Sequence, residues 1–211
     1  MKSFARSFSI FILAGLLGAF ALPAFAASST FALDPNHTQV RINWNHFGFS
    51  NPGASFDVSK GTLIWNADDP TQSSVTVTIP VASADTQVPA LDARFKSQFF
   101  EADKYPTITF KSTSVNRIGV SDHYRVQGKL TVHGITKPVT LDATLNKVGE
   151  HPMLHAPAIG FDATATVKRS EFGLDAYVPV VSDLVTIHIT AEGVAPAALA
   201  KEEKAVKAES K

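Results

Sequence analysis

Histidine and carboxylate side chains are the groups through which this chain could bind a metal ion. His151 and His155 are four residues apart, an interval at which one face of a helix presents two zinc ligands. Pro152 lies between them and Gly149 precedes them, so we expect a loop rather than a helix. No third ligand is close in the sequence, and we therefore predict no metal site.

Motifs of common hydrolases and nucleotide-using enzymes are absent from the sequence. It contains no Cys, no Gly-x-Ser-x-Gly elbow, no His-Glu-x-x-His motif and no phosphate-binding glycine loop. Pairs such as Asp34 with His37, or Asp183 with His188, are expected by chance in a chain of this length. We predict no catalytic residue, no required cofactor and no enzymatic activity.

Aromatic side chains are more prominent, because the chain has 15 Phe residues and several fall outside the regular strand pattern. Rigid aromatic rings at the opening of a cavity offer a large contact area with few rotamers to freeze. Ordinary core packing is the alternative for each of them. The apolar side chains predicted to contact a ligand are Ile42, Trp44, Phe47, Phe49, Phe56, Phe95, Phe99, Phe100, Phe110, Leu141, Phe161 and Phe172.

Three polar residues have two interpretations each. Arg169 could hold a ligand headgroup with its planar fork of donors, or it could pair with a nearby carboxylate and fix a loop. His37 and His46 could donate a hydrogen bond to a ligand carbonyl, although a His near a strand end more often satisfies a backbone group.

The elements that position these residues are strands, since apolar side chains recur at every second position between Phe31 and Gly193. We count about eight such segments, separated by Gly, Pro, Asn, Asp and Ser. The stretch from Gln87 to Phe100 differs, because its apolar residues have helical spacing. It predicts a short helical segment across one opening of the sheet structure.

Eight antiparallel strands with one apolar face can form either a two-sheet sandwich or a closed barrel. Periodicity alone leaves both open. Gly128, Ala143, Ala163 and Ala165 fall on the apolar face, and small wall residues leave room for a ligand inside an eight-stranded barrel. We therefore favour an all-β fold, an antiparallel barrel with an internal space.

The first 26 residues have the features of a secretory signal peptide. Lys2 and Arg6 precede the apolar run from Phe8 to Leu22, and a small-x-small site ends at Ala26. We predict cleavage there and a periplasmic location, with secretion beyond the periplasm or an uncleaved anchor as alternatives. After cleavage we expect no stable membrane insertion.

The charge of the mature chain disfavours nucleic acid as a partner. Without the leader, 17 Lys and Arg face 19 Asp and Glu, a formal net charge of −2, and a basic footprint is lacking. The last segment, residues 195–211, is rich in Ala, Lys and Glu without a consistent apolar face. We predict a flexible tail there, as a solvated, frayed helix or disorder.

Four sequence blocks, in one order and at one spacing, carry a family resemblance. They run from Asn36 to Leu63, Leu91 to Thr113, Val126 to Leu145 and Phe161 to Gly193, and include the distinctive stretches FFEADKYP and GKLTVHGITKPV. Together they resemble the YceI-like family of secreted polyisoprenoid-binding proteins over about residues 31 to 194. Glu101 and Glu171 stand where that family usually has Asp, which preserves the charge.

The resemblance implies one lipid-binding domain, residues 27–194, with a lipocalin-like barrel of eight strands and an elongated apolar cavity. It also implies ligands such as polyisoprenoids, isoprenoid quinones or fatty-acyl amides, and a homodimer. We predict binding, carriage or storage of such a ligand in the periplasm. The alternative is a stress or adhesion module that acts through its outer surface without a ligand.

Overall fold

The computed structural model describes residues 28–209, and the predicted signal peptide of residues 1–26 lies outside this range. No helix within the described residues has the length and hydropathy needed to cross a membrane. Ten strands make up a single sheet. They are β1 (Ser29–Leu33), β2 (Gln39–His46), β3 (Gly53–Asp57), β4 (Lys60–Trp65), β5 (Ser74–Pro80), β6 (Thr107–Arg117), β7 (His123–Val132), β8 (Ile135–His151), β9 (Ala156–Lys168) and β10 (Val181–Val194).

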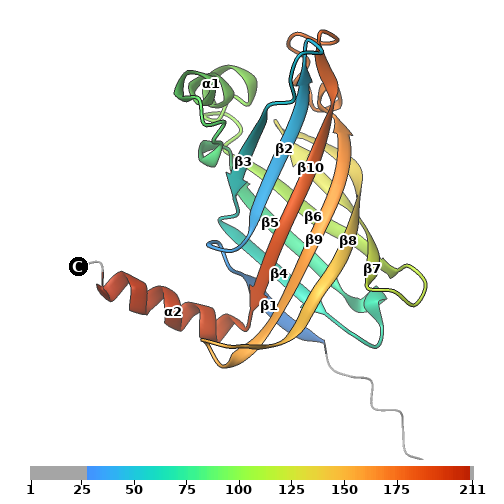
Figure 1. Ribbon diagram of the computed structural model, residues 1–211, viewed down its shortest axis with the longest axis vertical. Coiled ribbons are helices and arrows are strands. Elements are labelled where there is room, and N and C mark those ends of the chain that lie inside the picture. Colours follow the sequence, from blue (N-terminus) through green and yellow to red (C-terminus); the bar gives the residue numbers. More distant parts are fainter. Residues whose placement is uncertain (1–27, 210–211) are drawn as a thin grey trace, which may run out of the picture.

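These ten strands occupy eight positions in a closed antiparallel barrel (Figure 1). The ring runs β1, β4, β5, β6, β7, β8, β9 and β10, and it closes where Ala32 pairs with Val194 and Leu33 with Gly193. The strands β1 and β2 lie end to end along β10 and together form one barrel strand. On their other side, β4 pairs with β1 and β3 pairs with β2, so β3 and β4 form the next barrel strand. The first two barrel strands are therefore each broken in two, and the predicted eight-stranded barrel is confirmed.

The break between β1 and β2 follows from local sequence. Pro35 has no backbone N–H for the sheet, and the Asp34 carboxylate accepts a hydrogen bond of 2.8 Å from the backbone N–H of Asn36. This side-chain turn interrupts the ladder of sheet hydrogen bonds after Asp34, whose backbone N–H still donates to the Glu192 carbonyl of β10. The chain then re-enters the barrel at Gln39.

Alternation of side chains places the apolar face inside the barrel. In β4, the buried residues Gly61, Leu63 and Trp65 alternate with the exposed Lys60, Thr62 and Ile64. Of the four predicted small wall residues, Ala143 and Ala163 line the interior space. Gly128 instead makes room for a neighbouring ring, because a Cβ there would lie 2.3 Å from the Phe110 side chain.

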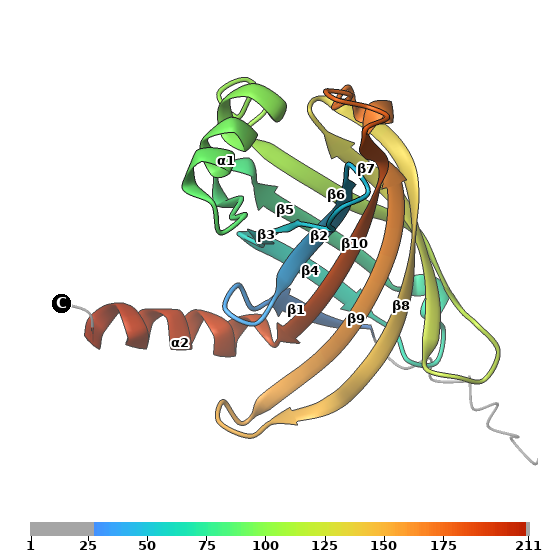
Figure 2. The same ribbon diagram turned by 45° about the horizontal axis from the view of Figure 1, so that its top comes forward.

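The predicted helical segment is present as α1 (Pro89–Arg94), which continues as a wider helical turn over Phe95–Phe99. Pro89 occupies the first turn, where its missing N–H costs no helical hydrogen bond. Figures 1 and 2 show α1 beside β3 at one end of the barrel. The Phe95 ring packs there against Trp44, with centroids 5.6 Å apart.

The C-terminal segment forms a second helix, α2 (Pro196–Glu209), which is the helical one of the two forms expected from composition. Leu199 is buried near the start of α2, and the rest of the helix extends away from the barrel (Figure 1). The helix lies at the end of the barrel opposite α1, so it is far from the segments that surround α1.

Candidate functional site

The candidate site is a cavity of about 900 Å³ inside the barrel. Every strand and α1 contribute side chains to its wall, and most of these are apolar. The volume lies at the upper end of the range of about 300–1,000 Å³ found for small-molecule pockets. The barrel interior is therefore only partly filled by its own side chains and has room for a ligand of considerable length.

The two ends of the cavity differ in exposure. At the end near α1, the lining residues Phe47 and Tyr177 are 48% and 62% exposed, and we call this end the mouth. At the other end, the lining residues Trp65, Ser73 and Tyr124 are 6%, 6% and 3% exposed, and we call it the buried end. A ligand would enter at the mouth and extend toward the buried end.

The structure brings twelve of the thirteen predicted ligand-binding residues to the cavity wall. They are Ile42, Trp44, Phe47, Phe56, Phe95, Phe99, Phe100, Phe110, Leu141, Phe161, Arg169 and Phe172. Phe49 is the exception: its side chain does not line the cavity and 92% of its surface is exposed. It lies in the turn between β2 and β3, where alternation no longer fixes which way a side chain points.

Phe47 reaches the cavity from the same turn because of its backbone conformation. Its φ of 54° is in the left-handed region, which a bulky residue rarely adopts. The Phe47 ring packs edge-on against His46, with centroids 4.2 Å apart, and the Phe47 N–H donates to the carbonyl of Val180 at 3.0 Å. The turn and the loop before β10 are thereby joined at the mouth.

Arg169 lines the mouth, but its guanidinium is largely occupied by the protein. It donates to the backbone carbonyls of Ser182 at 2.9 Å, Leu174 at 2.5 Å and Val181 at 3.0 Å. These bonds use three of its five N–H donors and fix the loop over residues 173–181. Burial lowers the pKa of Arg169. The loop-fixing interpretation is therefore observed, through carbonyls rather than a carboxylate.

A neighbouring carboxylate reinforces this loop. Asp183 accepts hydrogen bonds from the backbone N–H and the hydroxyl of Ser170, both at 2.8 Å. Hydrogen bonds from Ser170, followed by the charge of Arg169, hold the pKa of Asp183 below its usual range. The mouth is thus bordered on one side by a loop with several polar anchors.

Of the aromatic residues at the buried end, sequence reasoning selected Phe161 but not Trp65 and Tyr124. The ring centroid of Trp65 lies 5.2 Å from that of Tyr124 and 5.5 Å from that of Phe161, in edge-to-face arrangements. Trp65 and Tyr124 belong to strands whose alternation was recognised, so their inward direction was predictable. What the sequence lacked was the pairing that brings β4, β7 and β9 to the same end of the barrel.

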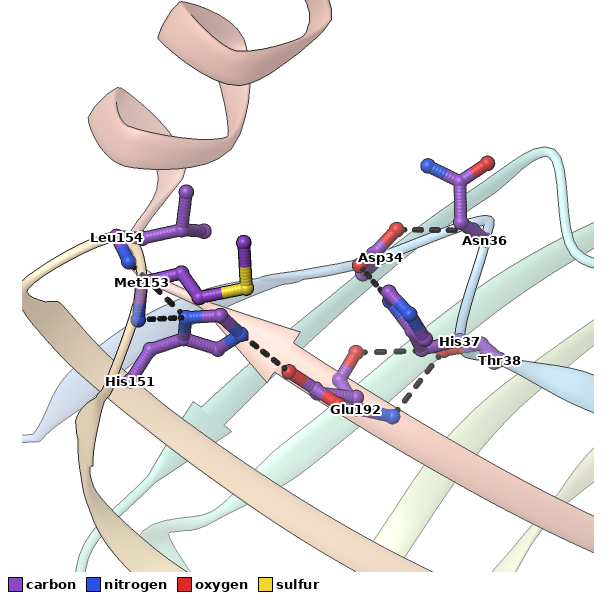
Figure 3. A network of polar contacts seen from close by, with 8 residues as sticks. All are labelled: Asp34, Asn36, His37, Thr38, His151, Met153, Leu154 and Glu192. Atoms are coloured by element: carbon purple, nitrogen blue, oxygen red, sulfur yellow. Dashed lines mark hydrogen bonds and ion pairs between the residues drawn. The ribbon is translucent and has the colours of Figure 1, made fainter.

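A polar cluster lies outside the cavity, over the seam where β1 meets β10 (Figure 3). His37 Nδ1 is 2.5 Å from Asp34 Oδ2, and Asp34 is only 3% exposed. The hydrogen bond to Asp34 raises the pKa of His37. Glu192 approaches from β10, and His151 Nε2 is 3.3 Å from its carboxylate.

The cluster joins three separate segments and includes Asp34 and His37, a pair that the sequence analysis attributed to chance. Asp34, His37 and Glu192 each have a side-chain nitrogen or oxygen atom of the kind that can bind a metal ion. These three atoms lie within 4.8 Å of one another. Glu192 is distant in sequence, so inspection of local spacing could not find this grouping. The Asp34 backbone N–H also donates to the Glu192 carbonyl at 2.8 Å. Asp34 and His37 therefore serve the closure of the barrel and not the cavity.

A closed eight-stranded antiparallel barrel with an apolar cavity defines a lipocalin-like binding fold. The chain belongs to the YceI family, because the model of the YceI-like domain matches residues 31–193. Protein YceI of Shigella flexneri is 35% identical over 187 residues, which cover 85% of this chain and 96% of that protein. The predicted family membership is thus confirmed.

Two solved structures share the fold. The crystal structure of Burkholderia cenocepacia BcnA has a TM-score of 0.68 and 25% identity, and the match covers 76% of this chain and 98% of BcnA. A domain from Saccharophagus degradans, described as polyisoprenoid binding, has a TM-score of 0.61 and covers 79% of this chain and 98% of its own. At 15% identity, the second likeness is one of fold alone.

Proposed function

We propose that this protein binds a long apolar lipid in the barrel cavity and carries or stores it in the periplasm. The ligand classes proposed are a polyisoprenoid, an isoprenoid quinone or a fatty-acyl amide. The apolar cavity of about 900 Å³ carries this proposal. The description of the S. degradans domain as polyisoprenoid binding and the leader-like N-terminus support it. The proposed role is binding, without catalysis.

Energetics favour a long chain over a short one. Burial of apolar carbon contributes about 0.8 kcal/mol per CH₂ before costs. For large ligands the net value falls to about 0.3 kcal/mol per heavy atom, so about forty carbons give roughly 12 kcal/mol and about twenty give roughly 6. These correspond to nanomolar dissociation constants and to tens of micromolar, respectively, on an order-of-magnitude scale.

Extraction of copurified lipid tests the proposal. The mature protein, purified from a bacterial host, is analysed by native mass spectrometry and then by extraction into organic solvent. We expect a bound apolar compound that is released on extraction. A protein that carries no hydrophobic compound and takes none up from lipid vesicles would rule out carriage.

Two variants on the same strand separate the cavity from the outer surface. Leu141 lines the cavity, whereas the adjacent Thr140 is exposed on the outside. We expect Leu141→Glu to abolish lipid binding, because an unpaired carboxylate in the cavity is costly, while Thr140→Glu retains it. Thermal unfolding of both variants controls for stability. Equal lipid content in the two variants would favour the alternative role through the outer surface.

A further inference from the structure

Two segments that border the mouth present apolar side chains to solvent. They are the turn after β2, residues 47–52, and the loop before β10, residues 173–180, which stand together at the top of Figure 1. We call these two segments the tip. Its exposed apolar residues, between 48% and 92% exposed, are Phe47, Phe49, Tyr177 and Val180. Contiguous exposed apolar groups on a soluble protein commonly mark a site of contact.

Backbone hydrogen bonds fix the shape of the tip. The Phe47 N–H donates to the carbonyl of Val180 at 3.0 Å, and the Val181 N–H donates to the carbonyl of Tyr177 at 2.8 Å. Phe47 and Tyr177 both have left-handed backbone conformations, with φ of 54° and 65°. A bulky residue keeps that conformation only where its surroundings enforce it, and such residues cluster at binding sites. The exposed rings are therefore a built feature of the tip.

The apolar surface of the tip is continuous with the wall of the cavity. Phe47 and Tyr177 line the cavity and are also exposed to solvent, whereas Phe49 and Val180 belong to the tip alone. A lipid that moves through the mouth thus passes along apolar side chains. If it then enters water, the cost is about 0.8 kcal/mol per CH₂. A partner that exchanges lipid at the mouth without this cost must itself have an apolar interior.

The size and charge of the tip favour a lipid bilayer as this partner. Three partly exposed aromatic residues and one Val offer roughly 500 Å², less than the roughly 800 Å² that each partner buries in a stable protein interface. A second copy joined only through the tip would therefore bury too little area. Neither segment contains Lys or Arg, so attraction to anionic headgroups is not the driving force. Aromatic side chains can instead insert between the headgroups of a bilayer.

We propose that the tip docks on the surface of a lipid bilayer, with Phe47, Phe49 and Tyr177 inserted among the headgroups, so that lipid passes between bilayer and cavity without crossing water. This inference rests on the proposed function and adds its partner. The tip lies at one extreme of the longest axis of the molecule, where a flat surface can meet it (Figure 1). Docking is peripheral and reversible, because only side chains of a turn and a loop enter the bilayer.

Lipid transfer to vesicles tests this inference. The mature protein, freed of lipid by detergent exchange, is loaded with a pyrene-labelled fatty-acyl amide and mixed with phosphatidylcholine vesicles, and pyrene fluorescence follows the transfer. We expect the transfer rate to rise with vesicle concentration and to change little with salt. Phe49→Ser should lower the rate about tenfold, because it removes the most exposed ring of the tip.

Two controls separate docking from lipid binding. Phe49 does not line the cavity, so the Phe49→Ser variant should bind the labelled lipid with unchanged affinity. Met153→Ser is the matched variant, because Met153 is 82% exposed but lies in the turn between β8 and β9, at the opposite end of the barrel (Figures 1 and 2). It should transfer lipid at the wild-type rate. Thermal unfolding verifies the fold of both variants.

The outcomes distinguish docking from the function on which it rests. If the labelled lipid binds but its transfer rate is independent of vesicle concentration, or if Phe49→Ser and Met153→Ser transfer it equally fast, the tip does not dock and lipid carriage stands. If Phe49→Ser lowers the molar mass measured by light scattering and leaves transfer unchanged, the tip contacts a second copy instead. If no labelled lipid binds and extraction of the purified protein releases no lipid, the proposed function itself fails.

Discussion

At the scale of single residues, the seam cluster shows how one hydrogen bond can make stability depend on pH. His37 Nδ1 contacts a nearly buried carboxylate of Asp34, and its pKa is raised as a result. A raised pKa means that the folded state holds the proton more tightly than the unfolded chain does. The stabilisation is therefore present below the unfolded pKa and is lost as the pH rises through the folded pKa.

We accordingly expect His37→Gln to lower the melting temperature more at about pH 5.5 than at about pH 8.5, because the charged imidazole gains more from the Asp34 carboxylate than the neutral imidazole does. Thermal unfolding monitored by circular dichroism measures the difference. His155→Gln is the control, since the His155 side chain is 78% exposed. A difference between wild type and His37→Gln that is the same at both pH values would contradict the expectation.

The direction of a side chain could be predicted from the sequence within strands but not within turns. Side chains within strands could be assigned to the cavity because alternation fixes their direction, and all those predicted line it. Phe47 and Phe49 are two residues apart in a turn, yet one lines the cavity and the other is exposed. Backbone dihedrals decide this, and sequence periodicity does not report them.

At the scale of elements, one close contact between strands depends on the absence of a side chain. Gly128 in β7 lies against the Phe110 ring of β6, and a Cβ at Gly128 would come within 2.3 Å of that ring. Gly149 in β8 is a strand glycine with open space, where the nearest atom to a Cβ is 3.5 Å away.

Gly128→Ala should therefore destabilise the protein by about 1–3 kcal/mol, because the Phe110 ring must move from its packed position. Gly149→Ala should change stability little. Denaturant unfolding of both variants measures the free energies of unfolding. Equal stability of the two variants would show that the Phe110 ring moves aside at little cost.

The strand and helix pattern was predictable because each element has its own period. The helical segment from Gln87 to Phe100 corresponds to α1 and the turn that follows it. The sequence did not predict that the first two barrel strands are each interrupted. The interruption is visible only in the strand pairing, because β1 pairs with β4 whereas β2 pairs with β3. Strand pairing is long-range information that a local pattern lacks.

At the scale of the whole molecule, export remains a prediction with a direct test. Expression of the full chain in a Gram-negative host should yield a periplasmic protein that begins at Ala27, because the small-x-small site ends at Ala26. Fractionation followed by intact mass measurement checks both the compartment and the cleavage position. Full-length protein retained in the membrane fraction would instead support the uncleaved anchor.

The homodimer implied by family resemblance is a separate prediction at this scale. Light scattering coupled to size-exclusion chromatography measures the molar mass of the mature protein in solution. Twice the mass of one mature chain is expected, and a single-chain mass would contradict it.

The pairing of β1 with β10 also constrains when the cavity can exist. The strands that close the ring begin at Ser29 and end at Val194, so the contact joins the two extremes of the domain. Such closure requires a long loop to be brought together, which is slow relative to local hairpin formation. A chain still emerging from synthesis has formed its first strand but not its last. The proposed lipid uptake is thereby confined to the completed molecule.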